Sequence, residues 1–335
     1  MVNRRTFGIL PDGTAVDAIT LGGADGVEIT VLTYGCIIMS LRVPDANGAM
    51  ASVVLGFDRL EPYLDSAPYI GAVAGRYANR IANARFAIDG REHHVSPNEP
   101  PNHLHGGFKG FDKRAWHAEV AGNGRAVELR RTSPDGEEGY PGTLDAQVTY
   151  TFAERELRVA YEAITDAATH VNLTQHSYFN LRGSGDVLGH CLAINASTFL
   201  PVNERLVPSG EFAPVANTPF DFQDATAIGA RLKSDHEQLQ RGGGYDHHFI
   251  LNRTDTTLAL AARVTEPTSG RTLEVRTTEP GLQFYSGQVV DYRGFCLEPQ
   301  HHPNSPNRAE FPSTLLRPGE RYRSTSHYTF GVRPK

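Results

Sequence analysis

Regular alternation of apolar and polar residues is the feature of this sequence that most restricts its fold. In segments 147–152 and 157–163, apolar side chains occupy every second position, which places them on one face of an extended chain. Residues 153–156 join the two segments, so together they predict a β-hairpin. Segment 322–330 alternates in the same way and predicts a strand near the end of the chain.

Turn dipeptides predict further hairpins. Asp89-Gly90 separates segments 86–88 and 91–95, and this dipeptide suits a type I′ turn, in which both central residues have positive φ. Asn47-Gly48 and Asn123-Gly124 mark two more turns. The chain contains 33 glycines and 21 prolines among 335 residues, more than is usual, which favours many turns and few long helices.

Signals for helices are few. Segment 226–240 is the strongest, with Ile228, Leu232 and Leu239 at roughly helical spacing and no proline inside it. Glycines 242–244 should end this helix. We therefore expect one short surface helix here, within a chain that is otherwise built of strands.

Charge and cysteine content exclude several classes of function. The chain carries 32 Lys and Arg against 38 Asp and Glu, a net charge of -6, with no basic run, so we expect neither a nucleic acid nor a membrane as partner. Cys36, Cys191 and Cys296 lie far apart and suit neither a disulfide framework nor a metal site. Buried thiols in a reducing compartment are the simpler interpretation.

Two segments are candidates for a membrane span or an export signal, and neither fits. The longest apolar stretch, residues 31–43, is interrupted by polar residues and is too short to cross a bilayer. Arg4-Arg5 is superficially like an export signal, but Pro11 to Gly13 follow where an apolar region should be. We therefore expect a cytoplasmic protein.

Histidines gather beside turn residues or at the ends of apolar strands, where sites on β-scaffolds are commonly built. Three interpretations compete: a metal site, structural hydrogen bonds, or acid–base chemistry by one histidine with one carboxylate. The metal interpretation is weak because no HExxH or CxxC…HxxxH spacing occurs. The candidate clusters are His103 and His105, His176, His247 and His248, and His301 and His302.

Other catalytic templates are absent. The sequence contains no GxSxG elbow, no GxxxxGK[ST] loop and no GxGxxG between a strand and a helix. Cys296 lies in the apolar run 295–297, where packing is a better explanation than nucleophilic catalysis. We therefore expect no nucleotide, redox cofactor or metal.

Seven short segments are spread along most of the chain, from residue 75 to residue 300, and their order makes the series specific. They are GRYANRI (75–81), NHLHGG with FDK (102–107 and 111–113), NLTQHSYFNL (172–181), TPFDF (218–222), GYDH (244–247), PGLQFYSG (280–287) and GFCLEPQ (294–300). Together they resemble the aldose 1-epimerase (galactose mutarotase) family. One departure is Gln175, because the family has Asn before the histidine of the third segment; Gln keeps the amide on a longer arm.

The resemblance implies an all-β fold, a large antiparallel β-sandwich or supersandwich with a few short helices. It also implies an isomerase that interconverts the α and β anomers of a free aldose, such as galactose or glucose, without a cofactor. Length alone suggests about two domains at roughly 150 residues each. The implied site residues run from Asn79 to Glu298, however, which is easier to build on a single domain of residues 1–335, as a monomer or homodimer.

The resemblance also assigns roles to individual residues. Glu298 would be the base at the anomeric hydroxyl and His176, as an imidazolium, the acid at the ring oxygen, with His105 helping to polarise that oxygen. Glycines 106 and 107 would let the sugar approach the backbone. Residues that would bind the sugar hydroxyls are Asn79, Arg80, Asp246 and Gln283. Because Glu298 follows an apolar strand, we expect a partly desolvated carboxyl with a raised pKa.

Three alternatives stay open at this point. A glycoside hydrolase could use Asp246 and Glu298 as its two carboxyl groups, about 5–9.5 Å apart. A non-catalytic carbohydrate-binding protein would keep the hydroxyl-binding residues but would have no reason to place Glu298 and His176 at one anomeric centre. An enzyme for sugar phosphates would need further Lys or Arg residues at its cleft.

Overall fold

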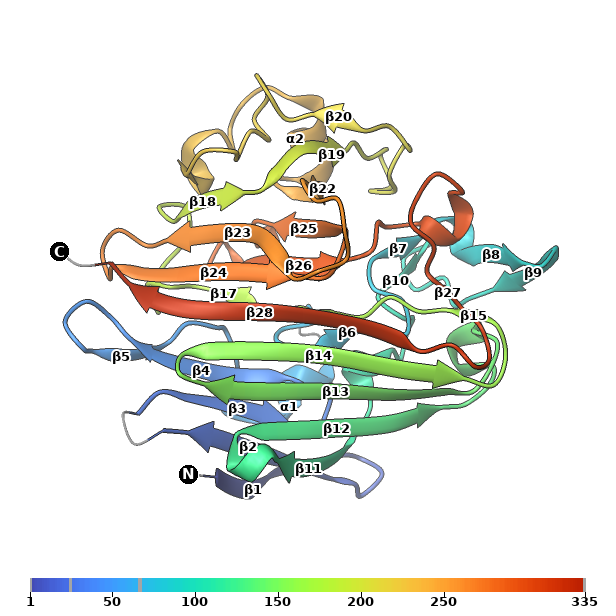
Figure 1. Cartoon of the computed structure of the whole chain (residues 1–335), viewed down its shortest axis with the longest axis horizontal. Coiled ribbons are helices and arrows are strands. Elements are labelled where there is room, and N and C mark those ends of the chain that lie inside the picture. Colours follow the sequence, from blue (N-terminus) through green and yellow to red (C-terminus); the bar gives the residue numbers. More distant parts are fainter. Residues whose placement is uncertain (1, 24–25, 66–67, 334–335) are drawn as a thin grey trace.

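Three antiparallel sheets carry the fold, and the largest has nine strands (Figure 1). The computed structural model describes residues 2–23, 26–65 and 68–333. In spatial order the nine strands are β11 (His117–Ala121), β12 (Ala126–Ser133), β13 (Leu144–Ala153), β14 (Glu156–Thr165), β28 (Tyr322–Val332), β24 (Arg271–Thr277), β23 (Ala259–Thr265), β18 (Cys191–Ile194) and β21 (Thr226–Ala227).

Two further sheets have five and six strands. The five-stranded sheet consists of β1 (Val2–Ile9), β2 (Ala15–Gly22), β3 (Glu28–Leu32), β4 (Ile38–Pro44) and β5 (Met50–Ser52). The six-stranded sheet has the order β17 (Tyr178–Phe179), β26 (Phe295–Gln300), β25 (Gly281–Tyr285), β22 (Asp246–Leu251), β19 (Ala196–Leu200) and β20 (Ala213–Pro214).

Short elements connect and brace these sheets. Four strand pairs are β6 (Val73–Ala74) with β16 (Thr174–Gln175), β7 (Arg80–Ile81) with β10 (His103–Leu104), β8 (Arg85–Ile88) with β9 (Arg91–His94), and β15 (Thr169–His170) with β27 (Leu315–Leu316). The α-helices are α1 (Glu61–Asp65) and α2 (Glu237–Gly242), and the 3₁₀ turns are Ala82–Ala84, Phe111–Lys113, Gly122–Gly124, Glu137–Gly139, Ile228–Ala230, Gln288–Val290 and Ser305–Asn307.

A shared apolar core joins the three sheets into a sandwich. One connected cluster of buried side chains runs from Ile19 in β2 to Phe330 in β28 and includes Phe284 in β25. Burial of this apolar surface is the main favourable contribution to folding. The predicted all-β sandwich with few short helices is confirmed.

The predicted hairpins are present. β13 and β14 pair antiparallel from Leu144 opposite Thr165 to Ala153 opposite Glu156, and their apolar face is buried. Asp89 and Gly90, at φ 50° and 78°, form the turn between β8 and β9. The turns at residues 47–48 and 123–124 also join paired strands, and the predicted late strand is β28.

The predicted helix at 226–240 is largely wrong. Only its end is helical, as α2 over Glu237–Gly242, while the beginning is a short strand and a 3₁₀ turn. The His236 side chain accepts a hydrogen bond from Gln238 N–H and begins the helix at 237, and Gly243 ends it with φ 61°. Ile228 is buried from the 3₁₀ turn, so its apparent helical spacing with Leu239 reflects packing of two separate elements.

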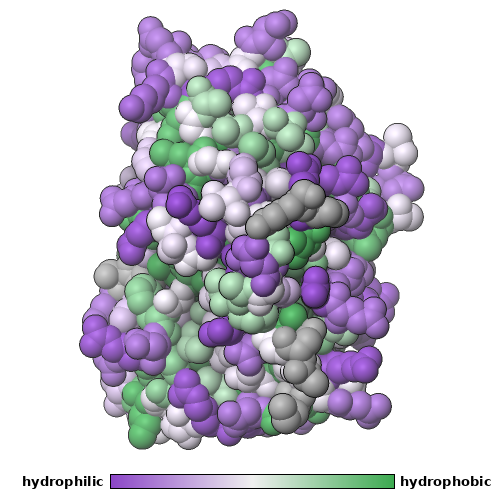
Figure 2. Space-filling model, turned by 90° about the vertical axis from the view of Figure 1, so that its left-hand side faces the viewer, coloured by the Kyte–Doolittle hydropathy of each residue, from purple (hydrophilic) through white to green (hydrophobic). Residues whose placement is uncertain are grey.

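The surface visible in Figure 2 is mixed in character, and two of the three thiols are buried. On the face shown in Figure 2, hydrophobic side chains lie in scattered areas between hydrophilic ones, as is usual when the core is already covered. None of the helices in the described ranges combines the length and apolar character needed to cross a bilayer. Cys36 and Cys296 are buried, as expected, but Cys191 is only partly buried.

Truncation of a core side chain tests the packing of the sandwich. Phe284 is fully buried and contacts the rings of Phe222 and Tyr245, with centroids 5.5 and 5.2 Å away. We expect Phe284→Ala to lower the free energy of unfolding by about 3–5 kcal/mol, because it leaves a cavity. Urea unfolding followed by fluorescence of Trp116, the single tryptophan, measures this change. Val120→Ala, at an exposed position, is the control and should lower the free energy of unfolding by less than about 1 kcal/mol. Equal losses for the two variants would contradict the placement of Phe284 in the core.

Candidate active site

A cleft with a volume of about 550 Å³ brings all seven predicted site residues together. Its lining includes aromatic, polar and charged side chains from segments far apart in the sequence. The predicted residues in it are Asn79, Arg80, His105, His176, Asp246, Gln283 and Glu298, and the others are Pro68, Tyr69, Glu99, Leu104, Tyr178, Leu206, Gly242, Tyr285, Gln288 and Val289.

The register of the six-stranded sheet places several of these side chains in rows. His248, Gln283 and Glu298 lie opposite one another on β22, β25 and β26. Asp246, Tyr285 and Cys296 form the neighbouring row on the same face, because each lies two residues away along its strand. The intervening residues, such as Phe284 and Leu297, point into the shared core. One face of the sheet therefore holds the cleft and the other holds the sandwich together.

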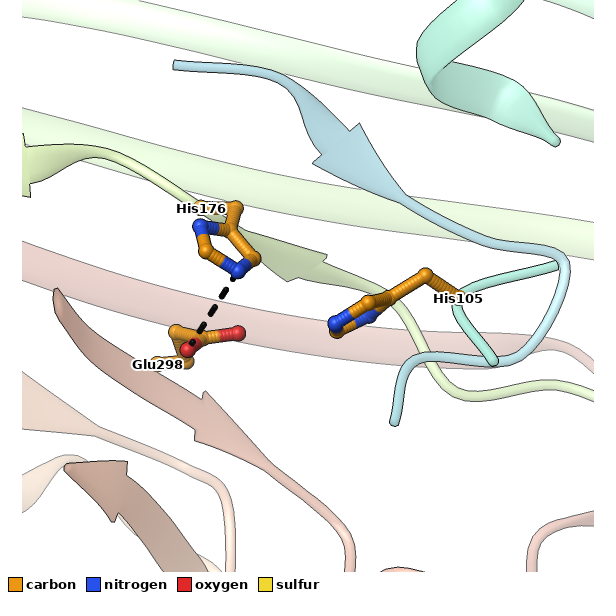
Figure 3. A group of neighbouring side chains, drawn as sticks. All are labelled: His105, His176 and Glu298. Atoms are coloured by element: carbon orange, nitrogen blue, oxygen red, sulfur yellow. Dashed lines mark ion pairs between the residues drawn. The ribbon is translucent and has the colours of Figure 1, made fainter. Parts of the chain in front are cut away.

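A buried carboxyl group and a buried imidazole face each other in the cleft (Figure 3). Glu298 Oε1 lies 3.8 Å from His176 Nε2, and the two side chains are 2% and 6% exposed. Burial raises the pKa of Glu298 well above its usual value, and the nearby charge of Asp246 raises it further, against the opposing effect of Arg80. The expected rise in the pKa of Glu298 is therefore confirmed.

His176 differs from the expected imidazolium. Burial lowers the pKa of His176 to about 4, which favours a neutral ring in the empty cleft. Its Nδ1 faces Cys296 Sγ at 3.5 Å, a contact in which either the ring or the thiol can donate. Nε2 is the ring nitrogen that faces Glu298 in the cleft.

Main-chain hydrogen bonds fix the tautomer of His105. The main-chain N–H of Asn79 donates to His105 Nδ1 at 3.1 Å, and the main-chain N–H of His105 donates to the Asn79 carbonyl at 3.1 Å. An acceptor at Nδ1 places the proton of the neutral ring on Nε2. Burial, together with the nearby charges of His176 and Arg80, lowers the pKa of His105 well below its usual value. His105 is thus a fixed hydrogen-bond donor.

The same three side chains have the composition of a metal site. One ligand atom from each of His105, His176 and Glu298 lies within 4.8 Å of the other two. A histidine ligand must offer a lone pair to the metal. In His105, however, Nδ1 already accepts from Asn79 and Nε2 carries the proton. The donor set therefore fits a metal poorly, and it suits hydrogen bonding and proton transfer.

The four predicted hydroxyl-binding residues form one connected group. Gln283 Nε2 donates to Asp246 Oδ1 at 2.6 Å, and Arg80 Nη1 lies 3.8 Å from Asp246 Oδ2. Asn79 Oδ1 accepts from the main-chain N–H of Arg80 at 2.9 Å. Gln283 Oε1 and Glu298 Oε2 are buried without a hydrogen-bond partner among the described residues. Unsatisfied buried acceptors of this kind suit a ligand that carries hydroxyl donors.

Gln175 stabilises the segment that carries His176. Its Oε1 accepts from Tyr150 O–H at 2.6 Å, and its Nε2 donates to the Gly71 carbonyl and, at 3.1 Å, to Ser177 Oγ. The longer side chain therefore does not weaken hydrogen bonding at position 175. The amide faces the interior of the protein and fixes the backbone next to His176.

Glycines 106 and 107 do not have the expected role. A Cβ atom at Gly106 would collide with the main chain of Gly75, and a Cβ atom at Gly107 would collide with the Glu138 carboxylate. Both also have positive φ, 93° and 105°. These glycines are required by packing within the protein, so close approach of a sugar does not explain them.

Two residues of the motif segments, His103 and Arg76, have structural roles. His103 is buried and hydrogen-bonds through its ring to the Ser96 carbonyl at 2.7 Å and Tyr140 O–H at 2.6 Å. Arg76 is also buried, and its guanidinium donates to main-chain carbonyls and to Ser133 Oγ. Both stabilise the loops beneath the cleft.

Tyr69 and Glu99 are among the residues of the cleft wall that were not predicted from the sequence. The Tyr69 ring contacts both imidazoles, with centroids 4.5 Å from His105 and 5.7 Å from His176. Glu99 binds Arg80 at the cleft wall. Glu99 lies in the turn sequence Asn-Glu-Pro-Pro-Asn, directly before the segment that contains His105. This closeness to a site segment could have indicated Glu99 as a candidate.

Comparisons with known proteins agree along the whole chain. A family model described as Aldose 1-epimerase matches residues 17–329. A galactose mutarotase from Rattus norvegicus is 46% identical over 99% of each chain, and an aldose 1-epimerase from Escherichia coli is 39% identical over 97% of this chain and 98% of its own.

A solved structure shows the same fold. The crystal structure of a galactose 1-epimerase from Lactobacillus acidophilus has a TM-score of 0.88 at 29% identity and covers 99% of both chains. The hydrolase and binding-protein alternatives receive no support from these relatives, which are isomerases by name. With a family model that spans the cleft residues and relatives that match from end to end, this chain belongs to the aldose 1-epimerase family.

Proposed function

We propose that this protein interconverts the α and β anomers of free aldoses, with galactose and glucose as substrates, by acid–base opening and closure of the sugar ring. Glu298 and His176 exchange the protons, and His105 donates a hydrogen bond to the ring oxygen. The observation that carries the proposal is the buried pair of Glu298 and His176, with Oε1 3.8 Å from Nε2 in a cleft lined by hydroxyl-binding groups.

The reaction needs two proton transfers. The anomeric hydroxyl loses a proton while the ring oxygen gains one, the aldehyde carbon rotates, and the ring closes on the opposite face. A base and an acid that reach different oxygens of one sugar are the minimum. Glu298 and His176 come from different segments and approach the same space, which suits this requirement (Figure 3).

Burial determines where the proton of the pair resides. In the empty cleft the raised pKa of Glu298 and the lowered pKa of His176 favour a protonated carboxyl and a neutral imidazole. Oε1 and Nε2 are 3.8 Å apart, too far for direct transfer, so a sugar hydroxyl or a water between them relays the proton to Nε2. The relay creates the carboxylate base and the imidazolium acid together. Hydroxyl groups of a bound sugar that donate to Glu298 stabilise its charged form and promote this transfer.

Ring opening then reverses the charge separation. The Glu298 carboxylate takes the proton of the anomeric hydroxyl, and His176 gives its proton to the ring oxygen. The products are the open-chain aldehyde and the neutral pair that burial favours, so desolvation assists this step. On closure His176 takes the proton back from the ring hydroxyl and Glu298 returns one to the aldehyde oxygen. No proton is gained or lost overall.

Charge in the cleft disfavours phosphorylated sugars. Among the described residues that line the cleft, Arg80 is the one Lys or Arg, and it is already bound to Glu99. Glu99, Asp246 and Glu298 contribute carboxyl groups to the same lining. A phosphate would thus lack the free basic partners that it needs, and we propose neutral aldoses as substrates.

We also propose a domain organisation, a compartment and an oligomeric state for the protein. We propose that residues 1–335 act as one unit, because the cleft draws on segments from Pro68 to Glu298. We place the protein in the cytoplasm, because Cys36, Cys191 and Cys296 are free thiols. The chain is predicted to work as a monomer or homodimer.

The activity itself is tested by polarimetry. We expect the protein to accelerate the change in optical rotation of freshly dissolved α-D-galactose and α-D-glucose to the same final value that buffer alone reaches. The final value is unchanged because a catalyst alters only the rate. Boiled protein is the control. No acceleration with any common aldose would exclude the proposed function.

Substitution tests the proton-transfer roles. Glu298→Gln and His176→Gln should each lower kcat by about 10²–10⁴-fold, because each removes one of the two proton-transfer groups. His117→Gln is the matched control, since His117 is exposed and lies on β11, away from the cleft residues. A Glu298→Gln variant with the wild-type rate would remove Glu298 as the base, while the fold and the other assignments would stand.

The pH profile tests the shared proton. The active pair carries one proton, so activity is lost when a second proton binds or when the last one leaves. Because burial lowers the pKa of His176 to about 4 and raises that of Glu298, kcat/KM should fall only below about pH 5. At alkaline pH, kcat/KM should fall as the pair loses its last proton, and the raised pKa of Glu298 determines where this happens. A fall centred at pH 6.5, the pKa of an ordinary histidine, would contradict the neutral imidazole.

A further inference from the structure

Glu99 binds Arg80 through two parallel hydrogen bonds at the cleft wall. Arg80 Nε donates to Glu99 Oε2 at 2.6 Å, and Arg80 Nη2 donates to Oε1 at 2.8 Å. The Arg80 side chain is 8% exposed, whereas that of Glu99 is 36% exposed. A fork of this kind fixes the plane of the guanidinium as well as its position.

The fork leaves one nitrogen of Arg80 for the cleft. Nη1 faces Asp246 Oδ2 at 3.8 Å, which is too long for a direct hydrogen bond. Asp246 Oδ1 already accepts from Gln283. Nη1 and Oδ2 are therefore a donor and an acceptor, side by side, of the sort that a single sugar hydroxyl can bridge.

The main chain at Glu99 is held firmly. Glu99 N–H donates to the Asn102 carbonyl at 3.1 Å, and Asn102 N–H donates to the Glu99 carbonyl at 2.7 Å, around Pro100 and Pro101. Asn102 is buried, and its side chain accepts from Asn83 N–H and donates to the Arg205 carbonyl. These hydrogen bonds fix the main chain at Glu99 and so hold its carboxylate beside Arg80.

We propose that Glu99 is a specificity-determining and positioning residue of this epimerase, which aims Arg80 Nη1 at a sugar hydroxyl and neutralises the Arg80 charge so that neutral aldoses are preferred to anionic sugars. The inference rests on the proposed function and deepens it. Glu99 acts through Arg80 and takes no part in proton transfer.

The same contacts determine how Arg80 would meet an anionic sugar. With Glu99 in place, the Arg80 guanidinium has one carboxylate bound and a second, Asp246, nearby. An anionic sugar would therefore meet a basic group that is already paired. Without the Glu99 charge, the buried guanidinium would be free to bind the carboxylate of a uronic acid.

The test compares Glu99→Gln with a matched control. Gln keeps the length of the side chain but removes its charge and one acceptor. Glu274→Gln is the control, because Glu274 binds Arg263 and Arg276 at 2.8 and 2.7 Å on β24 and does not line the cleft. Polarimetry with D-galactose and D-galacturonate gives kcat and KM for each protein, and urea unfolding checks that the variants are folded.

Glu99→Gln should raise KM for D-galactose about 5- to 20-fold and change kcat less than about threefold, because binding is weakened and the chemical step is untouched. The ratio of kcat/KM for D-galactose to that for D-galacturonate should fall at least about tenfold. Glu274→Gln should match the wild type. An unchanged KM and ratio, or a kcat that falls as much as kcat/KM, would overturn the inference.

A binding measurement separates this inference from the proposed function. 1,5-Anhydro-D-galactitol has no anomeric hydroxyl, so it tests binding without reaction. Calorimetry should show weaker binding to Glu99→Gln than to the wild type by about the same factor as the change in KM. Wild-type protein that fails to epimerise any aldose would refute the proposed function, whereas equal binding of the analogue by both proteins would refute the role of Glu99 alone.

Discussion

The site depends on the burial of one carboxyl group and one imidazole with a single proton between them. Desolvation penalises charge on both Glu298 and His176, so the neutral arrangement is favoured in the empty cleft. The charged arrangement differs only by the position of that proton, and because Oε1 and Nε2 lie 3.8 Å apart, a hydroxyl between them must relay it. Such a pair can supply a base and an acid at once and recover its initial state after each turnover, which is why no cofactor is needed for the proposed chemistry.

The sheets provide the precision that this pair requires. Alternation along β25 and β26 sends Phe284 and Leu297 into the core and Gln283 and Glu298 into the cleft. Glu298 therefore cannot shift without disturbing the packing of the sandwich. His176 is held from the opposite side by the hydrogen bonds of Gln175. Rigid elements that hold the reacting groups are a general requirement for proton transfer at short range.

Much of the fold and the site residues could be predicted because they depend on local patterns or on motifs. The β13–β14 hairpin follows from alternation, and the turn at Asp89-Gly90 follows from the φ that its residues tolerate. The helix at 226–240 failed because Ile228 and Leu239 are buried from two separate elements. The protonation of His176 depends on burial by distant segments, and the contacts of Tyr69 and Glu99 depend on tertiary structure. None of these is visible in the local sequence.

The two histidines of the cleft show how neighbouring groups give similar side chains different properties. An N–H from Asn79 occupies the Nδ1 lone pair of His105 and fixes its proton on Nε2, so this ring donates a hydrogen bond and has no free lone pair with which to accept a proton. The Nε2 of His176 instead faces the Glu298 carboxyl group, where a bridging hydroxyl can relay a proton between them. The two imidazoles, whose ring centroids are 5.2 Å apart, are therefore not interchangeable. This difference in surroundings is the reason that we propose proton transfer for His176 and polarisation for His105.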